Sequence, residues 1–188
     1  MSEAPILNII GEKVALGPHR RDLLPAYLRW INNFEVRGMM GSNLRPMTLE
    51  AETDWYEKAS REAKDVHFTV YDTATLTPIG TTALHNVHHY HRTAEFGIMI
   101  GDPANWNKGY GTETTRLMLR HGFVGLGLHA IRLRVYGNNP RALRAYEKAG
   151  FQIAGRLREA LRVDGEVCDE IYMDCLATEW LTKEDADA

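Results

Sequence analysis

The order of segments between residues 93 and 150 restricts the fold of this chain more than any other feature of its sequence. An apolar run, "TAEFGIMI" (Thr93–Ile100), is followed by the glycine-rich loop "NWNKGYGTE" (105–113) and by a helical pattern from Gly111 to about Gly125. The alternating run "AIRLRVYG" (Ala130–Gly137) then predicts a second strand. Two neighbouring strands joined through a helix run parallel, because only antiparallel strands can be joined by a short turn. We therefore predict a mixed sheet with at least one parallel crossover.

The segment after this second strand predicts the clearest helix in the chain. Asn139 is placed as its N-cap, Pro140 takes the first helical position, and Gly150 supplies the C-terminal stop. One face of this helix is apolar and the opposite face is charged. The apolar face holds Ala142, Ala145, Tyr146 and Ala149, and the charged face holds Arg141, Arg144, Glu147 and Lys148.

The remaining segments predict further strands and two N-terminal helices. The strands are "VALGP" from Val14, "VHFTVYD" from Val66, "IGTTALHNV" from Ile79, and the pair "FQIAGRLREAL" and "EIYMDCLATEW" around an Asp164–Gly165 turn. Asp22 and Thr48 are placed as the N-caps of the helices. The predicted fold class is α/β (α+β), a mixed central sheet with helices on both faces. We expect a single domain over residues 1–188, with an ordered core at about 13–180 and a flexible tail at 181–188.

Composition excludes several classes of function. The chain of 188 residues has a formal net charge of -3, which argues against a nucleic-acid partner. No run approaches the roughly 18 apolar residues of a membrane span, so no membrane partner is expected. The N-terminus "MSEAPILNII" has no basic region before its apolar run and does not predict a secretory signal. We expect a cytoplasmic protein.

The loop at 105–113 has the features of a phosphate-binding turn. A helix begins within it, and the first amides of a helix have no partner inside the helix and attract anions. Glycine lets the main chain approach a ligand closely. The pattern is neither the GxGxxG of a dinucleotide fold nor a P-loop, and a tight turn with no ligand is the alternative for this loop taken alone.

Four segments together resemble the GNAT superfamily of acetyl-CoA-dependent N-acetyltransferases. They are "AEFGIMI", "NWNKGYGTE", "VYGNNPRALRAYEKAGF" and "VDGEVCDEIYM". Within the superfamily they are similar to the branch with ribosomal-protein N-terminal acetyltransferases and spermidine acetyltransferases. The resemblance covers roughly Val66 to Trp180 and implies a GNAT-type sheet and acetyl-CoA as the cosubstrate.

The resemblance also implies a set of cofactor-binding residues. The strand "GIMI" would pair with the pantetheine arm, and the amides of the glycine loop would hold the pyrophosphate. Trp106 stands where the family usually has Gln or Arg. The residues implied are Ile98, Met99, Ile100, Trp106, Asn107, Lys108, Gly109, Tyr110, Gly111, Thr112, Asn139, Arg141, Ala142 and Tyr146. Asn139 can serve both as the helix cap and as a pantetheine contact.

Two side chains are the catalytic candidates. Tyr146 occupies the position of the family's proton donor and would protonate the departing thiolate, although a core tyrosine is the ordinary interpretation of an aromatic residue on this face. Glu95 lies in the middle of an apolar strand, where a carboxylate needs a partner or a cleft. We interpret it as the base, acting through water, with a structural salt bridge as the alternative.

The segment "HNVHHYHR" brings four histidines into seven residues, His85, His88, His89 and His91. Strand alternation would place these rings on both faces, and the segment offers no carboxylate or thiol to complete a ligand set. No metal is therefore expected. His85 and His91 are candidates for substrate contact at the strand end.

The acceptor is expected to be a primary amine. The polyamine branch carries acidic residues between its first helices, whereas the matching stretch here reads Asn43, Leu44, Arg45 and Pro46. Arg45 would repel a polycation, which favours a peptide N-terminus, an amino sugar or an amine-bearing small molecule over the alternative, spermidine. A non-catalytic acyl-CoA-binding module is a second alternative. Association as a homodimer, through an exposed strand edge or through the two terminal strands, is compatible with the sequence, which fixes no stoichiometry.

Overall fold

The computed structural model describes residues 4–41, 45–163 and 165–187, with side chains up to residue 182. In this described part, eight strands form one mixed sheet in the order β1-β2-β3-β4-β5-β6-β8-β7. The strands are β1 Ile9–Ile10, β2 Val14–Gly17, β3 Val66–Asp72, β4 Pro78–His88, β5 Thr93–Ile100, β6 Ala130–Tyr136, β7 Gln152–Val163 and β8 Glu166–Leu176. The α-helices are α1 Leu24–Ile31, α2 Phe34–Gly38, α3 Leu49–Ala59, α4 Tyr110–Arg120, α5 Pro140–Ala149 and α6 Ala177–Asp187.

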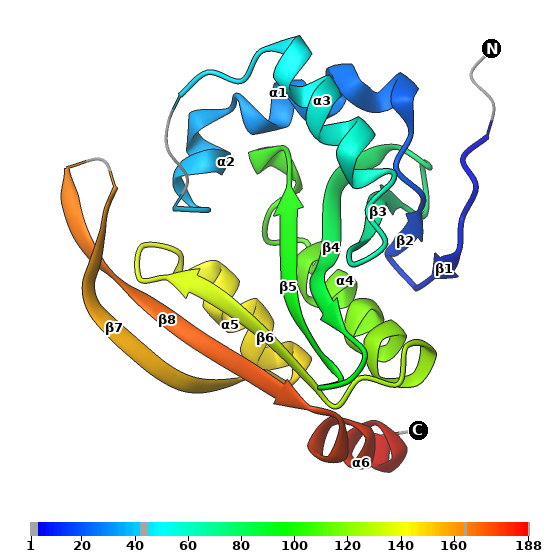
Figure 1. Ribbon diagram of the computed structural model, residues 1–188, viewed down its shortest axis with the longest axis vertical. Coiled ribbons are helices and arrows are strands. Elements are labelled where there is room, and N and C mark those ends of the chain that lie inside the picture. The colour runs from blue at the N-terminus through cyan, green and yellow to red at the C-terminus, as the bar shows by residue number, and fades with distance from the viewer. Residues whose placement is uncertain (1–3, 42–44, 164, 188) are drawn as a thin grey trace.

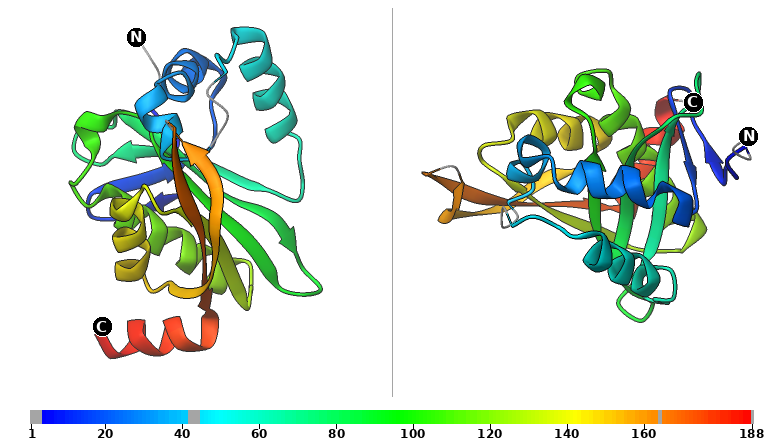
Figure 2. Two further views of the ribbon diagram at one scale, coloured as in Figure 1. Left: turned by 90° about the vertical axis from the view of Figure 1, so that its left-hand side faces the viewer. Right: turned by 90° about the horizontal axis from the view of Figure 1, so that it is seen from above.

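Helices cover the two faces of the sheet, as the fold class predicts (Figures 1 and 2). Helices α4 and α5 cover one face, where Phe68, Leu84 and Phe96 pack into the main core with Met118 and Leu119 of α4. The other face of the sheet lies on the side of α1 and α3. It carries His67, Ala83 and Gly97, which are register partners on β3, β4 and β5. Alternation along each strand therefore gives the sheet an apolar face and a face rich in polar and small residues.

The sheet is split between β5 and β6. These two strands are parallel, as predicted, and pair only from Thr93 to Glu95 with Ala130 to Arg132. Beyond Glu95 the two strands diverge, which Figure 1 shows as a V that opens toward α2. The residues of β5 from Phe96 onward pair with β4 on one side, but they have no strand pairing with β6 on the other.

Most local predictions are confirmed. Thr48 Oγ1 accepts from the amide of Ala51 at the start of α3, and Asn139 Oδ1 accepts from the amide of Ala142 at the start of α5. Gly150 ends α5 with φ +117°. The hairpin β7–β8 forms, although Asp164 of its predicted turn lies outside the described residues.

Several boundaries were predicted wrongly. Asp22 is not a helix cap: it lies in a 3₁₀ turn, Arg21–Leu23, and its carboxylate binds Arg20, while α1 begins at Leu24. The sequence reasoning also missed β1 and the short helix α2, and it continued the last strand to Trp180, whereas β8 ends at Leu176. The chain then enters α6, whose backbone takes in residues 181–187 of the predicted tail.

A Gly150→Ala substitution tests the predicted helix stop. A non-glycine residue at this left-handed φ costs about 1–2 kcal/mol, and a methyl group would lie 2.7 Å from Cδ1 of Trp180. We expect the free energy of unfolding in urea to fall by at least about that amount. Gly155→Ala is the matched control, because Gly155 has ordinary φ and open space around its Cβ position. Equal stability of the two variants would contradict the prediction.

Candidate active site

A cavity of about 280 Å³ lies at the open end of the V, between the end of β5, the loop 105–109, and the starts of α4 and α5. All but one of the predicted cofactor-binding residues line it. They are Ile98, Met99, Ile100, Trp106, Asn107, Gly109, Tyr110, Gly111, Thr112, Asn139, Arg141, Ala142 and Tyr146. Lys108 is the exception: it is exposed, and its Nζ lies 3.4 Å from Asn105 Oδ1. We call this cavity the cofactor groove.

The start of α4 presents unpaired amides to the groove. Gly109 is the N-cap and has φ +87°, a conformation that favours glycine. The amides of Tyr110, Gly111 and Thr112 make up the first helical turn, where backbone N–H groups have no partner inside the helix. No atom lies within 4 Å of the position that a Cβ on Gly111 would take, so this side of the turn faces open space. A helix start of this kind is suited to binding an anion.

Lys13 adds a positive charge that the sequence reasoning missed. Its backbone amide donates to both carboxylate oxygens of Glu113, at 2.9 and 3.1 Å, which ties β2 to the first turn of α4. Its Nζ lies 3.4 Å from the position of a Cβ on Gly109. No local pattern could have identified Lys13, because 100 residues separate it from Glu113.

Trp106 closes one end of the groove. Its indole Nε1 donates to the Ile100 carbonyl at 3.1 Å, and the Arg141 guanidinium lies over its ring, 3.5 Å from the centroid. Burial lowers the pKa of Arg141, and the acidic Glu35 acts in the opposite direction. The tryptophan that replaces the family's usual residue therefore joins the end of β5 to the start of α5.

Tyr146 lies between the groove and a second, larger cavity. Its ring makes edge-to-face contacts with Phe96 and Phe151, at centroid distances of 6.0 and 6.1 Å. The residue lines both the cofactor groove and a cavity of about 710 Å³ that residues of β4, β5, β6 and β8 also line, which we call the acceptor cavity. Burial raises the pKa of Tyr146 to about 12. The phenol is thus protonated at neutral pH and can donate a proton.

Glu95 lies at the vertex of the V and lines the acceptor cavity. It is exposed, with His85 of β4 and Arg132 of β6 as its register partners. Within the described ranges its carboxylate has no hydrogen bond or ion pair. The role of Glu95 as a base stays a prediction, and the salt bridge considered as its alternative is not formed with any described residue.

A third cavity, of about 270 Å³, lies between α1, α3 and the polar face of the sheet. Met40 and Ile98 line this cavity, the acceptor cavity and the cofactor groove. Glu52 of α3 lines it and is only 5% exposed. Burial raises the pKa of Glu52, and Arg37 acts against that rise only through space. We call this cavity the side cavity.

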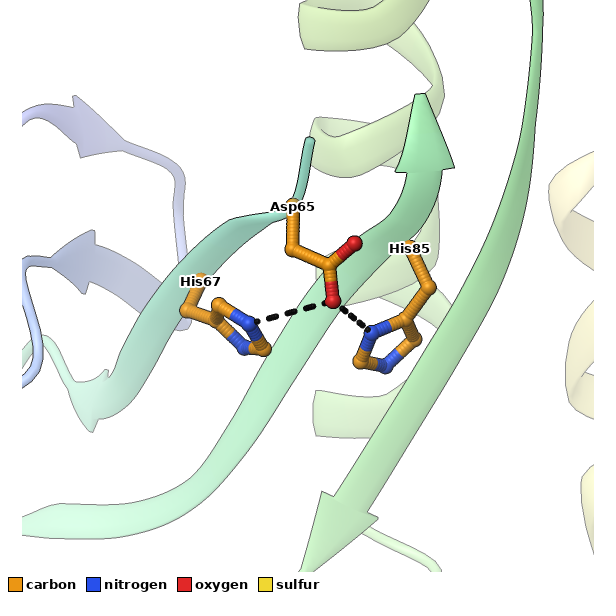
Figure 3. Close-up of side chains that lie close together, drawn as sticks. All are labelled: Asp65, His67 and His85. Carbon is orange, nitrogen blue, oxygen red and sulfur yellow. Dashed lines mark hydrogen bonds and ion pairs between the residues drawn. The ribbon is translucent and has the colours of Figure 1, made fainter. Parts of the chain in front are cut away.

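Asp65 connects two histidines that line the side cavity (Figure 3). Its Oδ2 is 2.8 Å from His85 Nδ1 and 3.5 Å from His67 Nε2, and its Oδ1 accepts from the amide of Asn86. Among the described residues, these three are the only group of His, Cys, Asp or Glu side chains close enough together to share a metal ion. The expectation that no carboxylate completes a ligand set with these histidines was wrong for His85, because Asp65 comes from the segment before β3, 20 residues away.

The other predicted substrate residues lie elsewhere. His91 stacks on His88 in the exposed turn after β4, with a centroid distance of 4.3 Å. Arg45 is exposed, and its carbonyl accepts from Arg37. Neither His91 nor Arg45 lines any of the three cavities, whereas His85 lines two of them. Asn43 and Leu44, on which the choice of acceptor also depends, lie outside the described residues.

Comparisons with known proteins agree with this geometry. Residues 13–152 match the family model of an acetyltransferase (GNAT) domain. The spermidine N(1)-acetyltransferase of Vibrio cholerae is 33% identical over 128 residues, which cover 68% of this chain and 73% of that protein. The enzyme of the same name from Escherichia coli K12 is 29% identical over 131 residues, 70% of this chain and 69% of that protein. A crystal structure of the Vibrio cholerae enzyme with CoA and spermine superposes with a TM-score of 0.82 at 27% identity, covering 90% of this chain and 98% of that one.

Among the described helices, none has the length and apolar character needed to cross a membrane.

Proposed function

This chain belongs to the GNAT family of acetyltransferases, and on that basis we propose that it transfers an acetyl group from acetyl-CoA to a primary amine of a polyamine of the spermidine type. The observation that carries the proposal is the split between β5 and β6. Tyr146 lies at this split and lines both the cofactor groove and the acceptor cavity. The two reactants can therefore meet in a ternary complex.

The residues of the groove are suited to hold acetyl-CoA. The amides of Tyr110, Gly111 and Thr112 would bind the pyrophosphate, with Lys13 as an additional cation. The side of β5 that does not pair with β6, from Ile98 to the amide of Ile100, would pair with the pantetheine arm, while the Ile100 carbonyl already accepts from Trp106. This arrangement would place the thioester close to Tyr146.

The reaction then requires a neutral amine and a proton for the departing thiolate. Tyr146 would supply that proton, since its raised pKa keeps the phenol protonated. Glu95 is exposed in the acceptor cavity, where its carboxylate would attract the acceptor's ammonium and could accept a proton through water.

The acceptor class rests on the carboxylates around the connected cavities. Glu95 faces the acceptor cavity, and Glu52 faces the side cavity without an ion pair to any described residue. A buried carboxylate with no partner is costly, and a bound ammonium group would offset that cost. In the sequence, Arg45 favours a less cationic acceptor, but in the structure it lines neither the acceptor cavity nor the side cavity. The similarity to spermidine acetyltransferases points the same way.

A panel of acceptors tests the proposal. We expect spermidine to release the CoA thiol from acetyl-CoA with a higher kcat/KM than N-terminal peptides or amino sugars. Glu52→Gln removes the charge with little change of shape. It should raise the KM for spermidine about tenfold, because losing one charged contact costs roughly 1.4 kcal/mol of binding free energy. The KM for a monoamine should change much less. Faster turnover of peptides would overturn the choice of polyamine, and no turnover of any amine would favour the non-catalytic acyl-CoA-binding module.

A further inference from the structure

The hydrogen bond between Asp65 and His85 fixes the orientation of an imidazole that lines both the acceptor cavity and the side cavity. Asp65 Oδ2 lies 2.8 Å from His85 Nδ1 and, as a carboxylate, can only accept. The proton of a neutral His85 ring is therefore on Nδ1, and the lone pair is on Nε2. Asp65 is held in turn by the amide of Asn86, which donates to its other oxygen at 2.9 Å.

The free nitrogen of His85 lies over Gly97 of β5. A Cβ on Gly97 would be 3.3 Å from His85 Nε2. Gly97 is next to Ile98, which lines the cofactor groove, and it lies on the same side of the sheet as Glu95. His85 and Tyr146 both line the acceptor cavity. An amine in this cavity can thus face an imidazole on one side and the phenol on the other.

We propose that His85 is the catalytic base that takes the proton from the acceptor's ammonium group, and that Asp65 is the residue that positions it. This inference rests on the proposed acetyl transfer and adds the proton acceptor of that reaction. Glu95, on the same face but without a partner among the described residues, attracts the cation, and in this inference His85 replaces it as the proton acceptor.

The protons balance in four steps. Nε2 of His85 takes one proton from the ammonium and becomes part of an imidazolium, whose charge Asp65 stabilises. The neutral nitrogen attacks the thioester carbon and forms the C–N bond. The C–S bond then breaks as Tyr146 protonates the sulfur, and the second nitrogen proton restores the phenol. His85 finally releases its proton to solvent through the open acceptor cavity.

Other ionisable groups surround His85 and shape this step. From the neighbouring elements they are Asp65, His67, Glu95, Arg132, Asp174, Glu52 and His19. Burial lowers the pKa of His67 and lowers that of His19 to about 4, so both rings are neutral near pH 7. Burial would raise the pKa of Asp65, but the hydrogen bonds from His85 and Asn86 outweigh it and lower that pKa. Asp65 is therefore ionised at neutral pH.

The test compares His85→Gln with the wild-type protein at saturating acetyl-CoA and spermidine across a range of pH. The wild-type kcat should fall on the acid side, where an imidazole becomes protonated. In His85→Gln we expect kcat near neutral pH to be lower by about tenfold or more, and the acid limb to disappear. The KM for spermidine should stay within about twofold, since only the transition state loses an interaction.

Two further variants complete the test. Asp65→Asn keeps the shape but removes the charge, and it should lower kcat severalfold while leaving the KM for both substrates nearly unchanged. His89→Gln is the matched control, because His89 is an exposed histidine of the same segment and lines none of the three cavities. Melting temperatures of all variants show whether any of them is destabilised. For a destabilised variant, the pH profile of kcat is measured at a lower temperature, where the protein is folded, and that profile tests the role of His85.

Three results would overturn the inference. They are an unchanged acid limb in His85→Gln, loss of that limb in Glu95→Gln instead, and activity that disappears with a chelator and returns with a divalent ion. A wild-type protein that acetylates no amine would refute the proposed function itself. If the wild-type protein is active and His85→Gln is equally active, this inference alone is refuted and the proposed function stands.

Discussion

Replacing Tyr146 by phenylalanine should lower kcat for acetyl transfer by about 100-fold to 1,000-fold, within the range for loss of a general acid. Tyr146 lines both the cofactor groove and the acceptor cavity, and burial keeps its hydroxyl protonated. The ring contacts with Phe96 and Phe151 do not involve the hydroxyl, so the variant should keep its fold. Thiol release under saturating conditions measures the effect.

Cofactor affinity separates this role from a structural one. The dissociation constant of acetyl-CoA, measured by calorimetry, should change less than about threefold in Tyr146→Phe, because the lost interaction forms only as the thiolate departs. A kcat close to that of the wild type would show that the sulfur receives its proton from another source. An equal loss of kcat and affinity would instead assign the phenol to binding.

A Gly111→Val substitution should weaken acetyl-CoA binding by about 100-fold or more, comparable to the loss of two charge-assisted hydrogen bonds. No protein atom lies within 4 Å of the new Cβ, so the side chain would extend into the space where the pyrophosphate must approach the amides. Titration calorimetry with acetyl-CoA measures the change.

Gly111 is a better test of the phosphate site than Gly109. Gly109 has φ +87°, and any side chain there would strain the backbone as well as the ligand. Gly155→Val supplies the control, since Gly155 also has open space and lies on β7, far along the chain from the loop. If Gly111→Val binds acetyl-CoA as tightly as the control does, the phosphate site lies elsewhere.

The parts of the fold that the sequence predicts correctly depend on short-range rules. Asn139, Pro140 and Gly150 specify the bounds of α5 within twelve positions, because a cap acts through the amides two or three residues away. Helix α2 was missed because five residues are too few to show a helical period, even though Asn33 caps it. The last strand was extended past Leu176 because "ATEW" contains no glycine or proline to mark its end.

The candidate site divides in the same way. The cofactor groove is largely a product of one segment, from β5 to α5, and its residues could be predicted because that segment resembles the GNAT superfamily. His85, Asp65 and His67 meet through the register of β3 and β4, which no local pattern specifies. Lys13 lies near Gly109 only because β2 lies beside the start of α4. Contacts of this kind become visible only when the strands are placed.

The divergence of β5 and β6 leaves a row of main-chain groups without the neighbour that a continuous sheet would give them. A coenzyme seated there would act as the absent strand, so part of the cohesion of the loaded protein would come from its ligand. Substitutions that brought β5 and β6 together would then stabilise the protein without coenzyme and, for the same reason, weaken its binding of the acetyl donor.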